Sequence, residues 1–216
     1  MVLVINREYS MKKLILGLAL TVAAFNHATA AEGNVEAGKT KSAMCAACHG
    51  PDGNSLVPIY PNLAGQSAEY IAKQLADFKD AMMSGGKSGR VDPVMGGMTM
   101  ALSEQDMLDI GAYYNAQTAK AGSGPSSDLG KSLYLSGDAE RGITACLACH
   151  GVNGKGMPSA AFPAIAGQNT AYLTAQLEKF RSGHRNNDTN AMMQNIAIKL
   201  EDADIAALAS FMSALK

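Results

Sequence analysis

Residues 45–49 read Cys-Ala-Ala-Cys-His, and residues 146–150 repeat the pattern as Cys-Leu-Ala-Cys-His. These two motifs contain all four cysteines of the 216-residue chain. Two thiols at this spacing on a helical turn can each form a thioether with a haem vinyl group, and the adjacent histidine can then ligate the iron. The motifs therefore predict two covalently bound haem c groups. The predicted attachment residues are Cys45, Cys48, Cys146 and Cys149.

Three other uses of paired cysteines fit the motifs less well. A zinc site could use the four cysteines together, but it would not require a histidine beside each pair. A thioredoxin-like dithiol is expected within a βαβ pattern, which the sequence does not show. Plain disulfides would leave the duplicated histidine unexplained. Covalent haem is preferred because it accounts for the cysteines, the histidines and the repetition together.

The sequences that follow the two motifs are also similar to each other. Residues 60–78 (YPNLAGQSAEYIAKQLADF) return at 162–180 as FPAIAGQNTAYLTAQLEKF, and residues 95–114 return at 193–212. The order is the same in both halves and the offsets stay near 100 residues. A repeat of this kind indicates tandem duplication of one domain of roughly 85 residues.

The duplication sets the expected domain organisation. We predict domains at 31–118 and 138–216, joined at 119–137 by a linker rich in glycine, serine and proline. Each domain shows three helical patterns and no convincing strand, so we expect an all-α fold. The first helix should enter the cysteine motif from about Val35 in one copy and from about Asp138 in the other.

The last helix of each domain carries the clearest periodic pattern. In the first copy it should begin at Ser103, with Asp106 three residues later as a capping-box pair. Its apolar residues recur at helical spacing and should face the core. They are Met107, Ile110 and Tyr113 or Tyr114 in the first copy, and Ile205, Leu208 and Phe211 in the second.

The N-terminal segment has the features of a secretory signal. Two lysines precede an apolar run from Leu14 to Phe25, and Ala28-Thr29-Ala30 supplies the small residues for cleavage before Ala31. The run is well short of the ~20 residues that span a bilayer as a helix, and an uncleaved anchor is the alternative. We assign 1–30 to the signal peptide, with residues 1–10 as an upstream start, and expect export to the periplasm.

Composition narrows the function further. The chain is 47% hydrophobic and 17% charged, which excludes a disordered polypeptide. After removal of the signal it has 15 basic and 18 acidic residues, a net charge of −3. A protein with this balance is not expected to bind nucleic acid.

The repeat also identifies candidates for the sixth iron ligand among 13 methionines. When the two copies are aligned through Leu102 and Leu200, Met95 and Met193 both lie seven residues upstream. Met98, the main rival, aligns with an isoleucine and is interpreted as a packing residue. With the motif histidines as fifth ligands, the predicted axial set is His49, Met95, His150 and Met193.

Two prolines follow the motif histidines at nearly equal distance. Pro61 lies 12 residues after His49, and Pro163 lies 13 residues after His150. A carbonyl at this point could accept the Nδ1 proton of the histidine and fix the ring, although a plain turn proline fits the spacing equally well.

Four other charged or titratable residues lie in loops near the predicted ligands. Arg90, Arg185 and Lys87 precede the methionines and could pair with haem propionates, but ordinary surface charge is the preferred interpretation. His184 is interpreted as a solvated loop residue.

These motifs together resemble the dihaem cytochrome c4 family over essentially the whole predicted mature chain. The resemblance rests on CAACHG and CLACHG, on YPNLAGQ and FPAIAGQ, and on the two methionine-to-helix segments. It implies two tandem cytochrome c-fold domains related by a pseudo-twofold axis, each built around one covalent haem with His and Met ligands. It also implies that Pro61 and Pro163 hold the histidines.

The resemblance implies a periplasmic electron carrier that feeds a haem-copper terminal oxidase and is not an enzyme. Peripheral association with a membrane is compatible with it, and we expect a monomer. A dihaem peroxidase would need an open sixth position, against which a methionine in both halves argues. A cytochrome subunit of a periplasmic dehydrogenase would have the same haem sites. A gas sensor is the least favoured, because no signalling domain is left in the chain.

Overall fold

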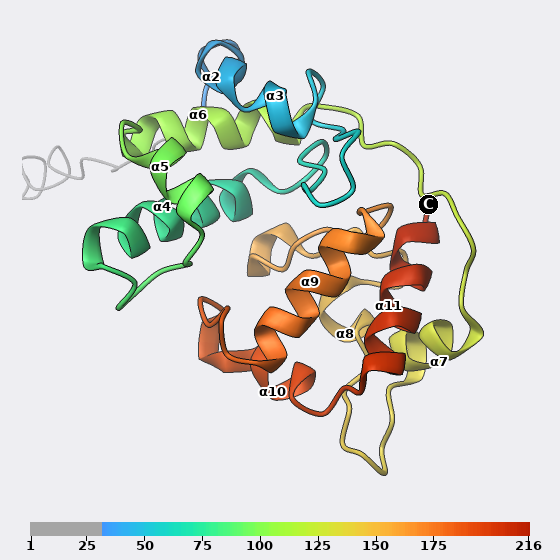
Figure 1. Ribbon diagram of the computed structural model, residues 1–216. Helices are drawn as coiled ribbons and strands as arrows, with labels where there is room; N and C mark the ends of the chain where they lie inside the picture. The colour runs from blue at the N-terminus through green and yellow to red at the C-terminus, as the bar shows by residue number, and fades with distance from the viewer. Residues whose placement is uncertain (1–31) are drawn as a thin grey trace, which may run out of the picture. The chain divides into compact units, whose positions relative to one another are not determined.

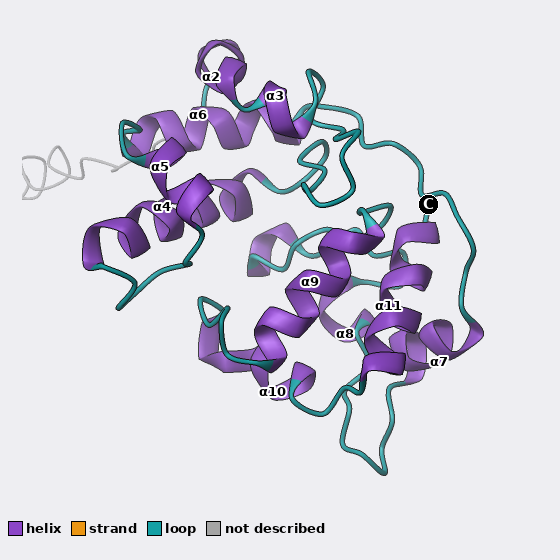
Figure 2. Cartoon of the chain, in the orientation of Figure 1, coloured by secondary structure: helices purple, strands orange, loops and turns teal. Residues whose placement is uncertain are grey.

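Helices and loops make up the part of the chain that the structure describes, residues 32–216 of a computed structural model (Figure 2). Within this range, extended pairing is limited to two isolated bridges, Asp138 with Ile143 and Met157 with Phe162. The all-α class is therefore confirmed. None of the helices in 32–216 has the length and apolar character needed to cross a membrane. The predicted signal peptide lies outside the described residues.

The helices occur in the same order in the two halves (Figure 1). The first half contains α2 (Val35–Lys41), η2 (Ser42–Met44), α3 (Ala46–His49), α4 (Ala68–Ser84), α5 (Pro93–Thr99) and α6 (Glu104–Asn115). The second half contains α7 (Asp128–Ser136), α8 (Leu147–His150), η3 (Pro158–Ala160), α9 (Thr170–Arg181), η4 (Thr189–Ala191), α10 (Met192–Ala197) and α11 (Asp202–Ala214). This repetition matches the duplication in the sequence.

Local capping explains where several helices begin. The Ser103 hydroxyl accepts from the Asp106 backbone N–H, and the Asp106 carboxylate accepts from the Ser103 backbone N–H, which confirms the predicted capping box of α6. Glu201 and Asp204 form the same reciprocal pair at the start of α11. Both boxes satisfy backbone donors that a helix start leaves unpaired.

The expected start of the first helix in the second half, about Asp138, is wrong. That helix is α7, Asp128–Ser136, which lies within the residues assigned to the linker and packs against α11. Its Leu133 and Tyr134 are buried, and burial of this apolar face stabilises the helix despite the glycine- and serine-rich sequence before it. The domain limits themselves stay a prediction.

Each half brings its first and last helices together at a glycine. A Cβ on Gly38 of α2 would lie 1.9 Å from the Asp109 carbonyl oxygen of α6. A Cβ on Gly130 of α7 would lie 2.0 Å from the Ala207 carbonyl oxygen of α11. No side chain larger than hydrogen fits at either crossing, so both helix pairs pack backbone to backbone.

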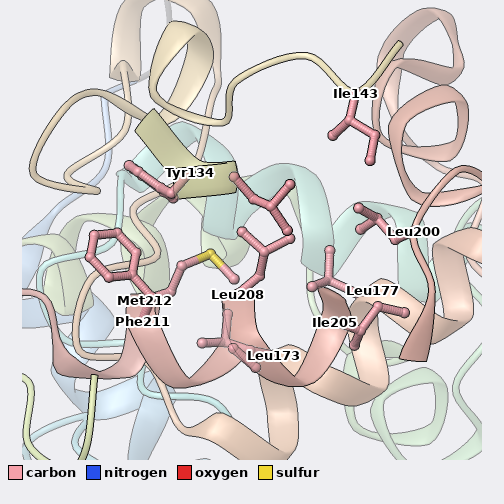
Figure 3. Close-up of a cluster of buried hydrophobic side chains, with 11 residues drawn as sticks. Tyr134, Ile143, Leu173, Leu177, Leu200, Ile205, Leu208, Phe211 and Met212 are labelled. Carbon is pink, nitrogen blue, oxygen red and sulfur yellow. The ribbon is translucent and has the colours of Figure 1, made fainter. Parts of the chain in front are cut away.

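The periodic residues of the last helices form the centre of each core. Met107, Ile110 and Tyr114 are buried in the first half, so Tyr114 rather than Tyr113 occupies the inward position. Figure 3 shows the second-half cluster. There Ile205, Leu208 and Phe211 of α11 lie with Leu173 and Leu177 of α9. The predicted inward residues of both helices are confirmed.

Candidate haem-attachment sites

Each cysteine motif folds as one short helical turn. The His49 backbone N–H donates to the Cys45 carbonyl at 2.9 Å, and His150 makes the same 2.9 Å bond to Cys146. All four cysteines are free thiols and partly buried. Each pair therefore lies on a single turn that ends at its histidine, as two adjacent thioether bonds to one haem require.

The geometry argues against the rival uses of these cysteines. Within residues 32–216, no group of three or more His, Cys, Asp or Glu side chains is placed to hold a metal ion, so the four thiols do not gather into a zinc site. Burial raises the pKa of Cys45, and it raises the pKa of Cys146 to about 11. A catalytic dithiol needs the opposite shift, toward the thiolate.

Both motif histidines are buried and held by a backbone carbonyl. The Nδ1 of His49 lies 2.9 Å from the Pro61 carbonyl oxygen, and the Nδ1 of His150 lies 2.9 Å from that of Pro163. A carbonyl only accepts, so Nδ1 carries the proton and Nε2 keeps its lone pair for a metal. Burial lowers the pKa of both rings, which favours the neutral form that ligates iron.

The two predicted methionine ligands occupy equivalent places. Met95 of α5 and Cys45 both pack against the first core, and Met193 of α10 and Cys146 both pack against the second. Their backbone N–H groups donate to the carboxylates of Asp92, which caps α5, and of Asp188. 

The rival methionine of the first half has a different environment. Met98 is 37% exposed, whereas Met95 is partly buried against the core. The structure thus places Met95 on the same core as the cysteine motif and leaves Met98 at the surface.

The interpretation of Arg90 and Arg185 as surface charge is wrong. Arg90 is 9% exposed and Arg185 is 6% exposed, and both side chains reach into the opposite half. Lys87 and His184 do lie at the surface, as interpreted. Sequence reasoning missed this cluster because the partners of each arginine belong to the other copy.

The two arginines share a set of neutral partners. Arg90 donates to Gln74, Gln176 and Tyr172 at 2.7, 2.7 and 3.1 Å. Arg185 donates to Gln176, Tyr70, Gln74 and Asn187 at 2.9, 2.8, 3.1 and 3.1 Å. The repeated Tyr-x-x-x-Gln of 70–74 and 172–176 was the available signal, because it places a glutamine on the inward face of both helices.

The chemistry of this cluster fits the carboxylates of a haem. Neither arginine takes part in any ion pair among residues 32–216. Buried guanidinium groups are costly without an anionic partner. Haem propionates are carboxylates, so the donor set of this cluster is suited to them.

Comparison with known proteins adds independent support for the reading of the motifs. The cytochrome c family profile matches residues 35–116 and 127–216. The chain is 41% identical to cytochrome c4 of Azotobacter vinelandii over 210 residues, 95% of this chain and 100% of that protein. It is 33% identical to the thiosulfate dehydrogenase electron acceptor of Thiomonas intermedia over 214 residues, 96% of this chain and 94% of that protein.

A solved structure also resembles the fold. The crystal structure of reduced recombinant cytochrome c4 from Pseudomonas stutzeri matches with a TM-score of 0.81 at 41% sequence identity. The match covers 85% of this chain and 100% of that one. Both halves of the chain therefore have counterparts in a single known protein.

Proposed function

The chain belongs to the cytochrome c4 family of dihaem electron carriers, and we propose that it works in the periplasm with both irons ligated by histidine and methionine. It carries two covalent haem c groups and exchanges electrons with redox proteins. When bound, each haem supplies an iron that gains or loses one electron. The residues of the chain attach the group, orient its ligands and exclude water.

One observation carries the proposed ligation. In both halves the motif histidine donates Nδ1–H to the carbonyl of the following proline, Pro61 or Pro163. This bond fixes the ring with Nε2 available, which is the usual outer-shell arrangement of a ligating histidine. The methionines Met95 and Met193 lie on the same cores and are the proposed sixth ligands. A thioether ligand favours Fe(II) and raises the potential.

The location and the partners are proposed on separate grounds. The lysines, apolar run and small residues within 11–30 support export by a signal peptide and therefore a periplasmic protein. A respiratory donor and a haem-copper terminal oxidase are the proposed partners, because the family resemblance implies them. We propose that the protein is a monomer that can associate peripherally with a membrane.

Carbon monoxide tests the proposed ligation. The absorption spectrum of the dithionite-reduced, haem-loaded protein is recorded before and after addition of the gas. We expect no change, because a strong sixth ligand closes both irons. Stoichiometric binding at one haem would overturn the proposal and favour a dihaem peroxidase or a sensor.

A second candidate function concerns the donor. The match to a thiosulfate dehydrogenase electron acceptor spans nearly the whole chain, so the same haem sites could serve a periplasmic dehydrogenase of sulfur compounds. The two roles differ in the reaction that reduces the protein. Reduction by thiosulfate and a thiosulfate dehydrogenase, at a rate above that of reduction by a respiratory donor, would favour the second role.

A further inference from the structure

The side chains of two buried glutamines each form hydrogen bonds to the backbone of the opposite half. The Gln66 side-chain Nε2 donates to the Ala164 carbonyl at 2.8 Å, and its Oε1 accepts from the Ala164 N–H at 2.9 Å. In the opposite direction, Gln168 donates to the Asn62 carbonyl at 2.9 Å and accepts from the Asn62 N–H at 2.8 Å. Both glutamines are 7% exposed. Each amide thus engages both backbone groups of a single residue in the other half.

The residues that the glutamines engage directly follow the two prolines that hold the motif histidines. The N–H of Asn62 and the carbonyl of Pro61 belong to the same peptide group. That peptide accepts from His49 Nδ1 on one side and donates to Gln168 Oε1 on the other. A continuous chain of hydrogen bonds therefore runs from the histidine of the first half to the glutamine of the second.

The second half contains the equivalent chain. The peptide between Pro163 and Ala164 accepts from His150 Nδ1 and donates to Gln66 Oε1. Hydrogen bonds that share one peptide group polarise one another, so donation by its N–H makes its carbonyl a stronger acceptor. A stronger acceptor increases the basicity of the histidine that donates to it.

We propose that Gln66 and Gln168 are positioning residues for the iron-ligating histidine of the opposite half. Gln168 acts on His49, and Gln66 acts on His150, each through one shared peptide. The inference rests on the proposed histidine ligation and extends it across the two halves. A more basic histidine stabilises Fe(III), so each glutamine lowers the potential of the haem in the other half.

The hydrogen bonds between the two halves are not symmetric. The Asn169 side chain donates its Nδ2–H to the Tyr60 carbonyl at 2.7 Å, so the second half contacts the chain on both sides of Pro61. The equivalent residue of the first half is Ser67, whose hydroxyl instead accepts from the Tyr70 N–H and caps α4. Asn62 also donates its Nδ2–H to the Gly167 carbonyl at 3.1 Å, whereas its counterpart Ala164 has no side-chain donor. The segment that holds the histidine of the first half is therefore fixed by two more crossing bonds than that of the second.

Substitution of each glutamine tests the crossed arrangement. In Gln168→Leu we expect the midpoint potential of the first-half haem to rise while that of the second-half haem stays unchanged, and in Gln66→Leu we expect the reverse. NMR-monitored redox titration assigns each potential to its haem through the hyperfine-shifted resonances. A role that only stabilises the fold would shift both haems together or the haem of the substituted half, and either pattern would overturn the inference.

Asn169→Ser provides a second variant in case a leucine prevents folding. It installs the residue that the first copy already has, and it removes only the bond to Tyr60. We expect changed resonances of the His49 ring and of the first-half haem alone. Gln168→Met, which keeps the side-chain volume and removes both bonds to Asn62, should shift the same first-half resonances, and no shift there in a folded protein would contradict the inference.

Measurements on the unsubstituted protein distinguish a failure of the proposed function from a failure of this inference. Carbon monoxide binding, or NMR signals without histidine ligation, would overturn the proposed function before any variant is made. Histidine and methionine ligation in the parent protein, with no crossed shift in the folded variants, would overturn only the crossed positioning.

Discussion

Arg90 and Arg185, from opposite halves of the chain, donate to the same oxygen, Oε1 of Gln176, at 2.7 and 2.9 Å. Two buried cations that converge on one neutral acceptor repel each other in a medium of low dielectric constant. Their charge also acts on a neighbour. Burial alone would raise the pKa of Tyr172, but the charges of Arg90 and Arg185 outweigh burial and lower that pKa. The cluster is therefore strongly positive, and its donors suit a carboxylate.

Removal of one of these charges should lower the potential of at least one haem. In Arg185→Gln, Fe(III) gains stability relative to Fe(II) because a nearby positive charge is lost. We expect a fall on the order of tens of millivolts, the usual size of the effect of one unit charge in a protein medium of effective dielectric constant about 20. Redox titration measures it. Lys87→Gln, at an exposed lysine, is the control and should shift neither potential, since solvent and salt screen its charge.

Replacement of a proposed methionine ligand should open its haem. Met95→Ala and Met193→Ala should each allow carbon monoxide to bind one reduced haem per protein, seen in the absorption spectrum. Met98→Leu is the matched control, because Met98 is 37% exposed and aligns with an isoleucine in the second copy. If Met98→Leu opened a haem and Met95→Ala did not, the sixth ligand would be Met98, one helical turn after Met95, and the assignment would be wrong.

The two haems should differ in potential, with the first-half haem lower. Residues 31–118 contain 6 basic and 10 acidic residues, whereas residues 138–216 contain 7 of each. Negative charge around an iron stabilises its ferric state. Added salt should narrow the difference, because it screens exposed charges. Two indistinguishable midpoints at low ionic strength in a redox titration would count against this expectation.

The two glycines at which the first and last helices of each half meet should not accept a larger side chain without a loss of stability. Gly38→Ala and Gly130→Ala place a methyl group against a backbone carbonyl that cannot move without shifting a helix. We expect each to lower the free energy of unfolding by about 1–3 kcal/mol, the usual cost of overpacking. Urea denaturation of the haem-loaded protein measures the change. Lys39→Ala, at the exposed neighbour of Gly38 on α2, should change stability by no more than about 0.5 kcal/mol.

Local patterns were sufficient to predict much of this molecule. The cysteine motifs, the capping box at Ser103 and the inward face of the last helices depend on residues close in the chain, so the sequence displays them directly. Helix α7 was missed because a longer insert separates it from its cysteine motif than separates α2 from the first motif. The repeated Gly-Lys at Gly38 and Gly130 could have aligned the two helices.

Contacts between the copies could not be predicted in the same way. The Gly-Gln repeat was visible, but the partners of Gln66 and Gln168 lie 98 and 106 residues away. The burial of Arg90 depends on Gln176 and Tyr172, which belong to the other half. No periodicity or spacing within one copy records which residues of the second copy will face it, so these features needed the structure.

Acid should weaken the first half through Asp106. Its carboxylate pairs with Lys41 at 2.7 Å and accepts from the Ser103 backbone N–H, and these bonds lower its pKa from 3.8 to about 2. A carboxylate with a lowered folded-state pKa stabilises the fold above its unfolded-state pKa, so this contribution is full above about pH 4 and is lost as the pH falls toward 2.

Asp106→Asn should therefore be less stable than the parent protein at pH 7, and the difference between the two should shrink between pH 4 and pH 2. Urea denaturation of the haem-loaded proteins across this range measures the difference directly. Glu104→Gln, at an exposed acid in the same first turn of α6, is the control, since Glu104 makes no comparable bond among residues 32–216. A stability difference for Asp106→Asn that stayed constant down to pH 2 would show that the ionised carboxylate is not what stabilises this helix start.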